Sequence, residues 1–153
     1  MLRLVVAKEF IPYGTDSEMD KLVDSSDWSD RAAAAERGYA LDRLINDQNS
    51  IVREEVARYG YGLDVLVDDP DKDVRTVVAN QGYGLDKLVD DDDPDVRNEV
   101  AYQGYGLDKL VNDLDWTVRF EVAKQGYGLD KLINDPDERV RVEAEKQLRN
   151  RGK

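Results

Sequence analysis

The sequence contains neither cysteine nor histidine among its 153 residues. Without cysteine it has no disulfide, thiolate zinc site, iron–sulfur cluster or cysteine nucleophile. Without histidine it lacks the commonest general base and the usual imidazole metal ligand. Carboxylate chemistry remains open, but no carboxylate pair stands apart from the regular pattern described below. We therefore expect no cofactor, no metal and no enzymatic activity.

Basic residues are few compared with acidic ones. The chain has 22 Lys and Arg against 34 Asp and Glu, which gives a formal net charge of −12. A protein that binds a nucleic-acid backbone presents clustered Lys and Arg to the phosphates. An anionic membrane surface repels a chain of this charge. The composition therefore predicts no direct binding of nucleic acid and no membrane association.

Long apolar runs are missing as well. At the start of the chain, Arg3 and Lys8 enclose four uncharged residues. A signal peptide needs an apolar stretch of about 7–15 residues, and a membrane span needs about 20. The expected location is therefore cytoplasmic. The hydrophobic fraction of 41% is enough for a packed core.

The dominant feature is an internal repeat with a step of 22 residues. Each unit carries an arginine at one fixed position: Arg31, Arg53, Arg75, Arg97, Arg119 and Arg141. In most units valine precedes this arginine, alanine follows it by four residues, and a Gly-Tyr pair begins seven residues after it. A fixed period of this length is the sequence signature of a repeat architecture.

One unit, residues 71–92, predicts two helices. Asp71 is a suitable N-cap, and Val74, Val78 and Ala79 share one helical face. Gly82 can end this helix in a left-handed conformation. A shorter helix follows, whose apolar stripe is Leu85, Leu88 and Val89. Because two such helices cannot bury their apolar faces alone, neighbouring units must stack.

The repeat text resembles the leucine-rich repeat variant family and, more loosely, the HEAT repeats. The resemblance rests on Leu-x-x-Leu-Val-x-Asp-x-Asp from Leu85 to Asp93, followed by Val-Arg-x-x-Val-Ala at 96–101. The chain departs from the family in its Gln-Gly-Tyr-Gly break and in lacking a cysteine-rich cluster-binding segment. The resemblance implies a right-handed superhelix that serves as a binding scaffold.

Together these patterns predict an all-α, right-handed α-solenoid of about six 22-residue repeats, each with a long and a short helix. We expect a single repeat domain over residues 1–153. Residues 1–30 form an irregular N-terminal capping repeat, residues 31–140 the regular repeats, and residues 141–153 a C-terminal capping helix and tail.

An aspartate stands six residues before each arginine of the column from residue 53 onward. HEAT-type repeats show a similar spacing, where it builds a ladder between neighbouring units. The arginine lies beside an apolar valine, so its stem is expected to be half-buried and its head to need a carboxylate. The alternative is a row of arginines that binds an anion. The predicted ladder residues are Arg53, Arg75, Arg97, Arg119, Arg141, Asp47, Asp69, Asp91, Asp113 and Asp135.

Two aromatic patterns suggest binding. The tyrosine column packs between units or forms an exposed ladder for an extended peptide or a sugar: Tyr39, Tyr61, Tyr83, Tyr105 and Tyr127. The position after the arginine column is mostly polar or small and is expected to face solvent, but it holds Phe120 and Val142 near the end. Either these residues and Trp116, with Tyr102 as an extension, form a partner-binding patch, or they pack against the C-terminal tail.

The sequence therefore favours a non-catalytic protein–protein interaction scaffold whose partner is another protein. The alternative is an acidic inhibitor that imitates nucleic acid and occupies the basic groove of a nucleic-acid-binding enzyme. Stacked helices lie roughly 8–10 Å apart, whereas phosphates of one DNA strand are about 3.4 Å apart along the axis. A single Asp column therefore matches DNA poorly, and several columns would have to interleave.

Overall fold

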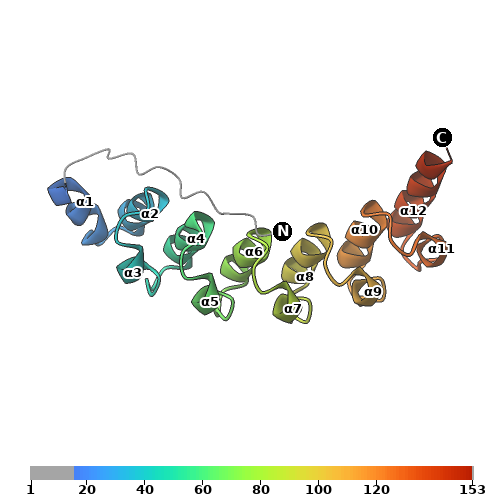
Figure 1. Ribbon diagram of the computed structural model, residues 1–153, viewed down its shortest axis with the longest axis horizontal. Coiled ribbons are helices and arrows are strands. Elements are labelled where there is room, and N and C mark those ends of the chain that lie inside the picture. The colour runs from blue at the N-terminus through green and yellow to red at the C-terminus, as the bar shows by residue number, and fades with distance from the viewer. Residues whose placement is uncertain (1–15, 153) are drawn as a thin grey trace, which may run out of the picture. The chain divides into compact units, whose positions relative to one another are not determined.

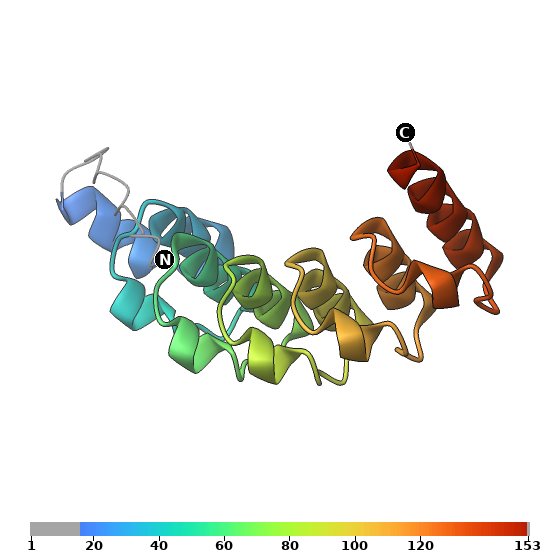
Figure 2. The same ribbon diagram turned by 45° about the vertical axis from the view of Figure 1, so that its right-hand side comes forward.

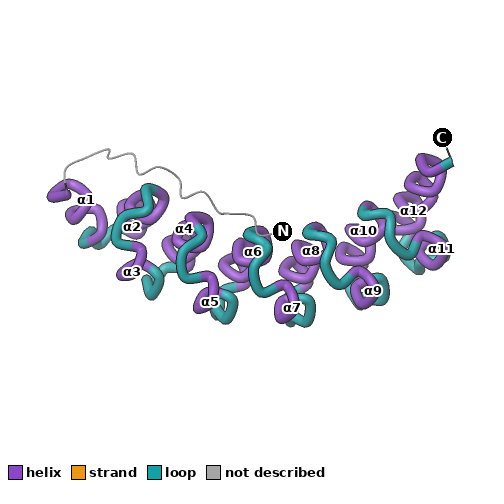
Figure 3. The backbone as a smooth tube through the Cα atoms, viewed as in Figure 1, coloured by secondary structure: helices purple, strands orange, loops and turns teal. Residues whose placement is uncertain are grey.

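A computed structural model describes residues 16–152, and within that range every regular element is a helix (Figures 1 and 3). The chain divides into two compact units, Met1–Gly62 and Leu63–Lys153. Residues 1–15, which include half of the predicted capping repeat, and residue 153 lie outside the described range. The all-α prediction is confirmed for the described residues.

The first unit contains four described helices. They are α1 (Asp16–Val23), α2 (Trp28–Glu36), α3 (Leu41–Leu44) and α4 (Ser50–Tyr59). The long helix α2 packs against both α1 and α4, and the short helix α3 contacts α2 and α4. Each helix therefore packs against its neighbours in the sequence.

The second unit alternates short and long helices. The short ones are α5 (Leu63–Leu66), α7 (Leu85–Leu88), α9 (Leu107–Leu110) and α11 (Leu129–Leu132). The long ones are α6 (Lys72–Asn80), α8 (Pro94–Tyr102), α10 (Trp116–Lys124) and α12 (Glu138–Arg151). Within this unit the long helices form one row and the short helices a second row, in both views (Figures 1 and 2). Contacts run between successive long helices, which is the pattern of a repeat array.

The helix boundaries follow from the capping residues of the repeat. Asp71 accepts a hydrogen bond from the Asp73 N–H at 2.9 Å, and Asp93, Asp115 and Asp137 cap their helices in the same way. Gly82, just after α6, has φ +73° and so ends the helix in the left-handed region. Four-residue short helices then fit between one glycine turn and the next capping aspartate.

The core is a column of identical positions. In the repeat that contains α6, Val74, Val78 and Ala79 are fully buried. Leu88 of the short helix α7 is also buried. The largest side chains with almost no exposure include the equivalent leucines of the second unit, Leu66, Leu88, Leu110 and Leu132. The apolar face predicted from one 22-residue repeat is therefore the surface that adjacent repeats share within a compact unit.

Two positions depart from the repeat and change the local structure. Leu148 replaces the glycine that ends α6, α8 and α10, and α12 accordingly runs for 14 residues instead of 9. Ala40 replaces the second glycine of the turn and adopts φ +51° without the freedom of a glycine. Both changes are visible in the sequence as interruptions of a glycine column.

None of the helices within residues 16–152 is both long enough and apolar enough to cross a lipid bilayer.

Candidate functional site

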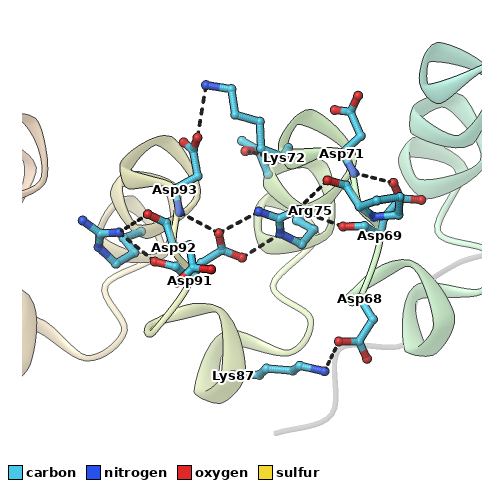
Figure 4. Close-up of polar contacts among 12 residues, drawn as sticks. Asp68, Asp69, Asp71, Lys72, Arg75, Lys87, Asp91, Asp92 and Asp93 are labelled. Atoms are coloured by element: carbon cyan, nitrogen blue, oxygen red, sulfur yellow. Dashed lines mark hydrogen bonds and ion pairs between the residues drawn. The ribbon is translucent and has the colours of Figure 1, made fainter.

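The arginine column of the second unit forms two-pronged ion pairs between successive repeats (Figure 4). Arg97 donates from Nε to Asp113 Oδ2 at 2.7 Å and from its second terminal nitrogen to Asp113 Oδ1 at 2.9 Å. Arg75 binds Asp91 and Arg119 binds Asp135 with nearly the same distances. In the first unit, Arg31 and Asp47 make an equivalent pair. A planar guanidinium matches a carboxylate in this arrangement.

Each of these aspartates joins two arginines in different ways. The Asp91 carboxylate accepts from Arg75 of α6, while the Asp91 backbone carbonyl accepts from Arg97 of α8 at 2.7 Å. The six-residue spacing in the sequence therefore corresponds to a backbone contact, and the carboxylate pair spans 16 residues. Arg53 similarly donates to the Asp47 carbonyl at 2.8 Å, and Arg141 donates to the carbonyls of Asp135 and Pro136. Asp69 also accepts from the Asp71 N–H.

The pairs keep their aspartates ionised in a buried setting. Burial by itself would raise the pKa of the Asp91 carboxyl, but hydrogen bonds from Arg75 and from the Asp93 N–H outweigh it and lower that pKa. Asp135 and Asp47 show the same balance, with Arg119 and Arg31 as partners, and their pKa values are also lowered. These carboxylates are held as acceptors, which removes them from acid–base chemistry at neutral pH.

A second, exposed set of side-chain contacts recurs along the short helices and consists of three ion pairs and one hydrogen bond to a neutral asparagine. Lys87 of α7 binds Asp68, Lys109 of α9 binds Asp90, and Lys131 of α11 binds Asn112. Arg43 makes the corresponding bond to Asp24 in the first unit at 2.6 Å. These contacts were not among those predicted from the sequence, although the repeat shows the 19-residue separation between their partners. Shallow grooves of about 460 and 500 Å³ lie beside these pairs.

Two of the aromatic residues singled out from the sequence, Trp116 and Phe120, are half-buried. Trp116 and Phe120 of α10 meet edge to face, with ring centroids 6.3 Å apart. The Arg139 guanidinium of α12 lies 3.3 Å from the centroid of the Trp116 ring. Asp137 holds that guanidinium through two hydrogen bonds of 3.0 and 2.7 Å. Arg139 in turn lowers the pKa of Asp137 to about 2. Trp116 therefore lies beneath a cation of α12, a contact that neither of the two alternatives from the sequence specified.

The position after the arginine column lies between adjacent long helices instead of facing solvent. Asn98 of α8 donates to the Thr117 carbonyl of α10 at 2.8 Å, and Phe120 is half-buried. Val142 of α12 is 54% exposed, because no described helix packs on the far side of α12. Tyr102, at the end of α8, is 57% exposed. Tyr102 and Val142 therefore lie on the two long helices that flank α10.

A row of glutamates on the same helices was not anticipated. Glu121 is buried and accepts from Lys124 at 2.6 Å and from Gln125 at 3.1 Å. Glu143 is paired with Lys146 and Gln147. Glu99 accepts from Asn80 and from Gln103. Each of these three carboxylates is thus ion-paired or hydrogen-bonded to side chains of the chain itself.

Within residues 16–152, no group of three carboxylates is gathered closely enough to hold a metal ion. The chain matches no protein-family model, no curated protein and no solved structure. The fold and the contacts described above are therefore the basis of the functional proposal.

Proposed function

We propose that this chain is a non-catalytic, protein-binding helical-repeat scaffold. The observation that carries the proposal is on the successive long helices α8, α10 and α12: Tyr102 and Val142 are exposed, and the Trp116–Phe120 pair is half-buried. Exposed aromatic and aliphatic side chains on a rigid helix row suit a partner's apolar surface. We call these four residues the long-helix face.

Rigidity supports this proposal. The Arg–Asp pairs tie each repeat of the second unit to the next, and the carboxylates in them are almost fully buried, with side-chain exposures of 3–8%. A partner therefore meets side chains on an ordered support and loses little freedom in ordering them. By resemblance to the leucine-rich repeat variants, we also propose a right-handed superhelix of about six repeats. The cytoplasmic location stays a prediction from the sequence.

The acidic mimic of nucleic acid has less support. Its most regular carboxylates, those of the Arg–Asp pairs, are turned toward arginine and are not available to a basic groove. A mimic would have to rely on the exposed aspartates alone. Complexes formed in that way dissociate as salt rises.

The experiment is affinity capture of partner proteins by the purified chain. Capture by the wild-type chain is compared with capture by a double variant and by a control variant. Tyr102→Ser with Val142→Ser should abolish capture while leaving the free energy of unfolding in urea within about 0.5 kcal/mol of the wild type, because both side chains are exposed. Leu114→Ser is the control, since Leu114 is 98% exposed but lies outside the long-helix face. Unchanged capture by the double variant contradicts the proposal. Capture that disappears between 0.15 M and about 1 M salt would favour the acidic mimic instead.

A further inference from the structure

The Gly-Tyr turns that follow the long helices form a repeated surface, and two of them are covered by planar side chains of the chain itself. In the first unit, the Tyr59 ring occupies the space beside Gly38 where a side chain would lie. In the second unit, the Arg151 guanidinium occupies the same space beside Gly126 and donates to the Gly126 carbonyl. The turn therefore accepts a flat group, and in one case that group is an arginine.

Arg151 reaches this turn because α12 continues past the point where other long helices stop. Leu148 and Arg149 stand where the other units have Gly-Tyr, so the helix runs on to Arg151. The guanidinium then lies over the turn of the preceding repeat. The contact is specific to the last repeat and has no counterpart at the two turns before it.

The two preceding turns of the second unit are open. A side chain added at Gly82 or Gly104 would meet no atom within 4 Å. The carbonyls of these glycines accept no hydrogen bond from any residue of the range 16–152. The nearby glutamines do not cover them, because Gln103 donates to the Asn80 carbonyl and Gln125 to that of Tyr102. Both turns thus offer the acceptor that Arg151 uses at Gly126.

Each open turn contains a half-exposed tyrosine, and the repeat places an exposed aspartate 19 residues before that tyrosine. Tyr83 and Tyr105 are 41% and 42% exposed. In the first unit the Tyr39 hydroxyl donates to Asp20, 19 residues earlier, at 2.8 Å. The aspartates at the equivalent sequence positions, 19 residues earlier, are Asp64 for Tyr83 and Asp86 for Tyr105. Both of these aspartates are exposed, and neither has a hydrogen bond or ion pair with another residue of the described range.

We propose that the Gly82–Tyr83 and Gly104–Tyr105 turns each bind an arginine side chain from an extended basic segment of a partner protein. The guanidinium donates to the glycine carbonyl, stacks on the tyrosine ring and faces the neighbouring aspartate. The chain's net charge of −12 favours a basic partner. This surface shares no residue with the long-helix face, although Tyr102 precedes Gly104 by two residues. Different variants therefore test the two proposals.

The repeat sets the spacing that the partner must have. Packed helices lie about 8–10 Å apart, and so do equivalent turns of adjacent repeats. A polyproline II segment rises about 3.1 Å per residue with three residues per turn, so every third side chain recurs on one side after about 9 Å. The matching segment therefore carries arginine at every third position.

The first test measures binding of labelled synthetic peptides by fluorescence anisotropy at 0.15 M salt. The probe is a proline-rich peptide with two arginines three residues apart. One comparison peptide carries lysines in their place, and another carries the arginines two residues apart. We expect the probe to bind at least tenfold more tightly than either. Equal affinities for all three would overturn the proposal, because they would show general charge attraction.

Variants of the chain locate the site. Tyr83→Ala with Tyr105→Ala, and separately Asp64→Asn with Asp86→Asn, should each weaken probe binding at least tenfold. Asp73→Asn with Asp92→Asn removes the same two charges from exposed positions away from the turns and should change binding less than about threefold. An equal loss in this control contradicts the proposal. The asparagine pair keeps the test decisive if the tyrosine variant does not fold.

A gain of binding provides the sharpest test. Arg151→Ala should uncover the Gly126–Tyr127 turn and create a third site in register with the other two. A peptide with three arginines at every third position should then bind the variant at least fivefold more tightly than the wild-type chain, while the two-arginine probe binds both equally. Unchanged or weaker binding of the longer peptide would overturn the assignment. Val142→Ser, which changes the long-helix face on α12 and no residue of a Gly-Tyr turn, should leave all peptide affinities unchanged and so separates this result from that of the long-helix face.

Discussion

Replacing Arg97 by alanine should destabilise the chain far more than a typical surface change. Arg97 donates two hydrogen bonds to Asp113 and two to the carbonyls of Asp91 and Asp92. Its removal leaves the Asp113 carboxylate, which is 6% exposed, without its counter-charge. Removing one partner of a buried ion pair costs about 3–5 kcal/mol.

The structure places the expected cost at the lower end of that range. Arg97 is 16% exposed, so water can reach part of the site after truncation. Asp113 also keeps the hydrogen bond from the Asp115 N–H at 2.8 Å. We therefore expect a loss of about 3 kcal/mol. With a urea m-value of about 2 kcal/mol/M, the midpoint should fall by about 1.5 M.

Urea unfolding followed by circular dichroism measures this shift, with Lys109→Ala as the matched control. Lys109 pairs with Asp90, and both side chains are more than half exposed, so that change should cost less than about 1 kcal/mol. Adding Asp113→Asn to Arg97→Ala removes the stranded charge and keeps an acceptor for Asp115, so stability should partly recover. A midpoint for Arg97→Ala no lower than that of Lys109→Ala refutes the reasoning.

Three further outcomes follow. Because the pKa values of Asp47, Asp91 and Asp135 are lowered on folding, their stabilisation is complete above the unfolded pKa of about 4 and is lost as pH falls through the lower folded values. The thermal midpoint should not fall between pH 8 and pH 5 but should fall below about pH 4, and a decline already above pH 5 contradicts this. Ala40→Gly should stabilise the chain by roughly 0.5–1 kcal/mol, because a glycine adopts the left-handed conformation without strain. The control Ala33→Gly, within α2, should destabilise the chain by about 1 kcal/mol. A urea midpoint for Ala40→Gly below that of the wild type would contradict this prediction. Trp116→Ala should lower the free energy of unfolding by at least about 1 kcal/mol, because the ring's contacts with Phe120 and Arg139 are lost. Leu114→Ala, at a fully exposed position, should lower it by less than about 0.5 kcal/mol. Equal urea midpoints for the two variants would show that the contacts of Trp116 contribute nothing.

The local structure of this chain could be predicted from one repeat. Asp71 as N-cap, Gly82 as the left-handed terminator and Val74 and Val78 as core residues all follow from short-range rules. The extension of α12 is also foreseeable from Leu148. These features depend on neighbours within a few residues, and the 22-residue period displays each of them several times.

Pairing between repeats could not be predicted in the same way. The sequence shows Asp91 six residues before Arg97, yet the carboxylate that binds Arg97 belongs to Asp113, 16 residues after it. Both aspartates occupy the same column, so the sequence alone does not distinguish them. The choice depends on the direction in which the arginine side chain extends between stacked helices, and only the tertiary structure sets that direction.

The same distinction between sequence and tertiary structure applies to the candidate binding surfaces. The sequence determined which positions are aromatic, acidic or glycine, because composition and period are written in it directly. The tertiary structure decided which of them are available: Trp116 lies under Arg139, the Gly126 turn is filled by Arg151, and the turns at Gly82 and Gly104 are open. Availability depends on which side chains of adjacent repeats reach a given position, and that is a property of packing in three dimensions.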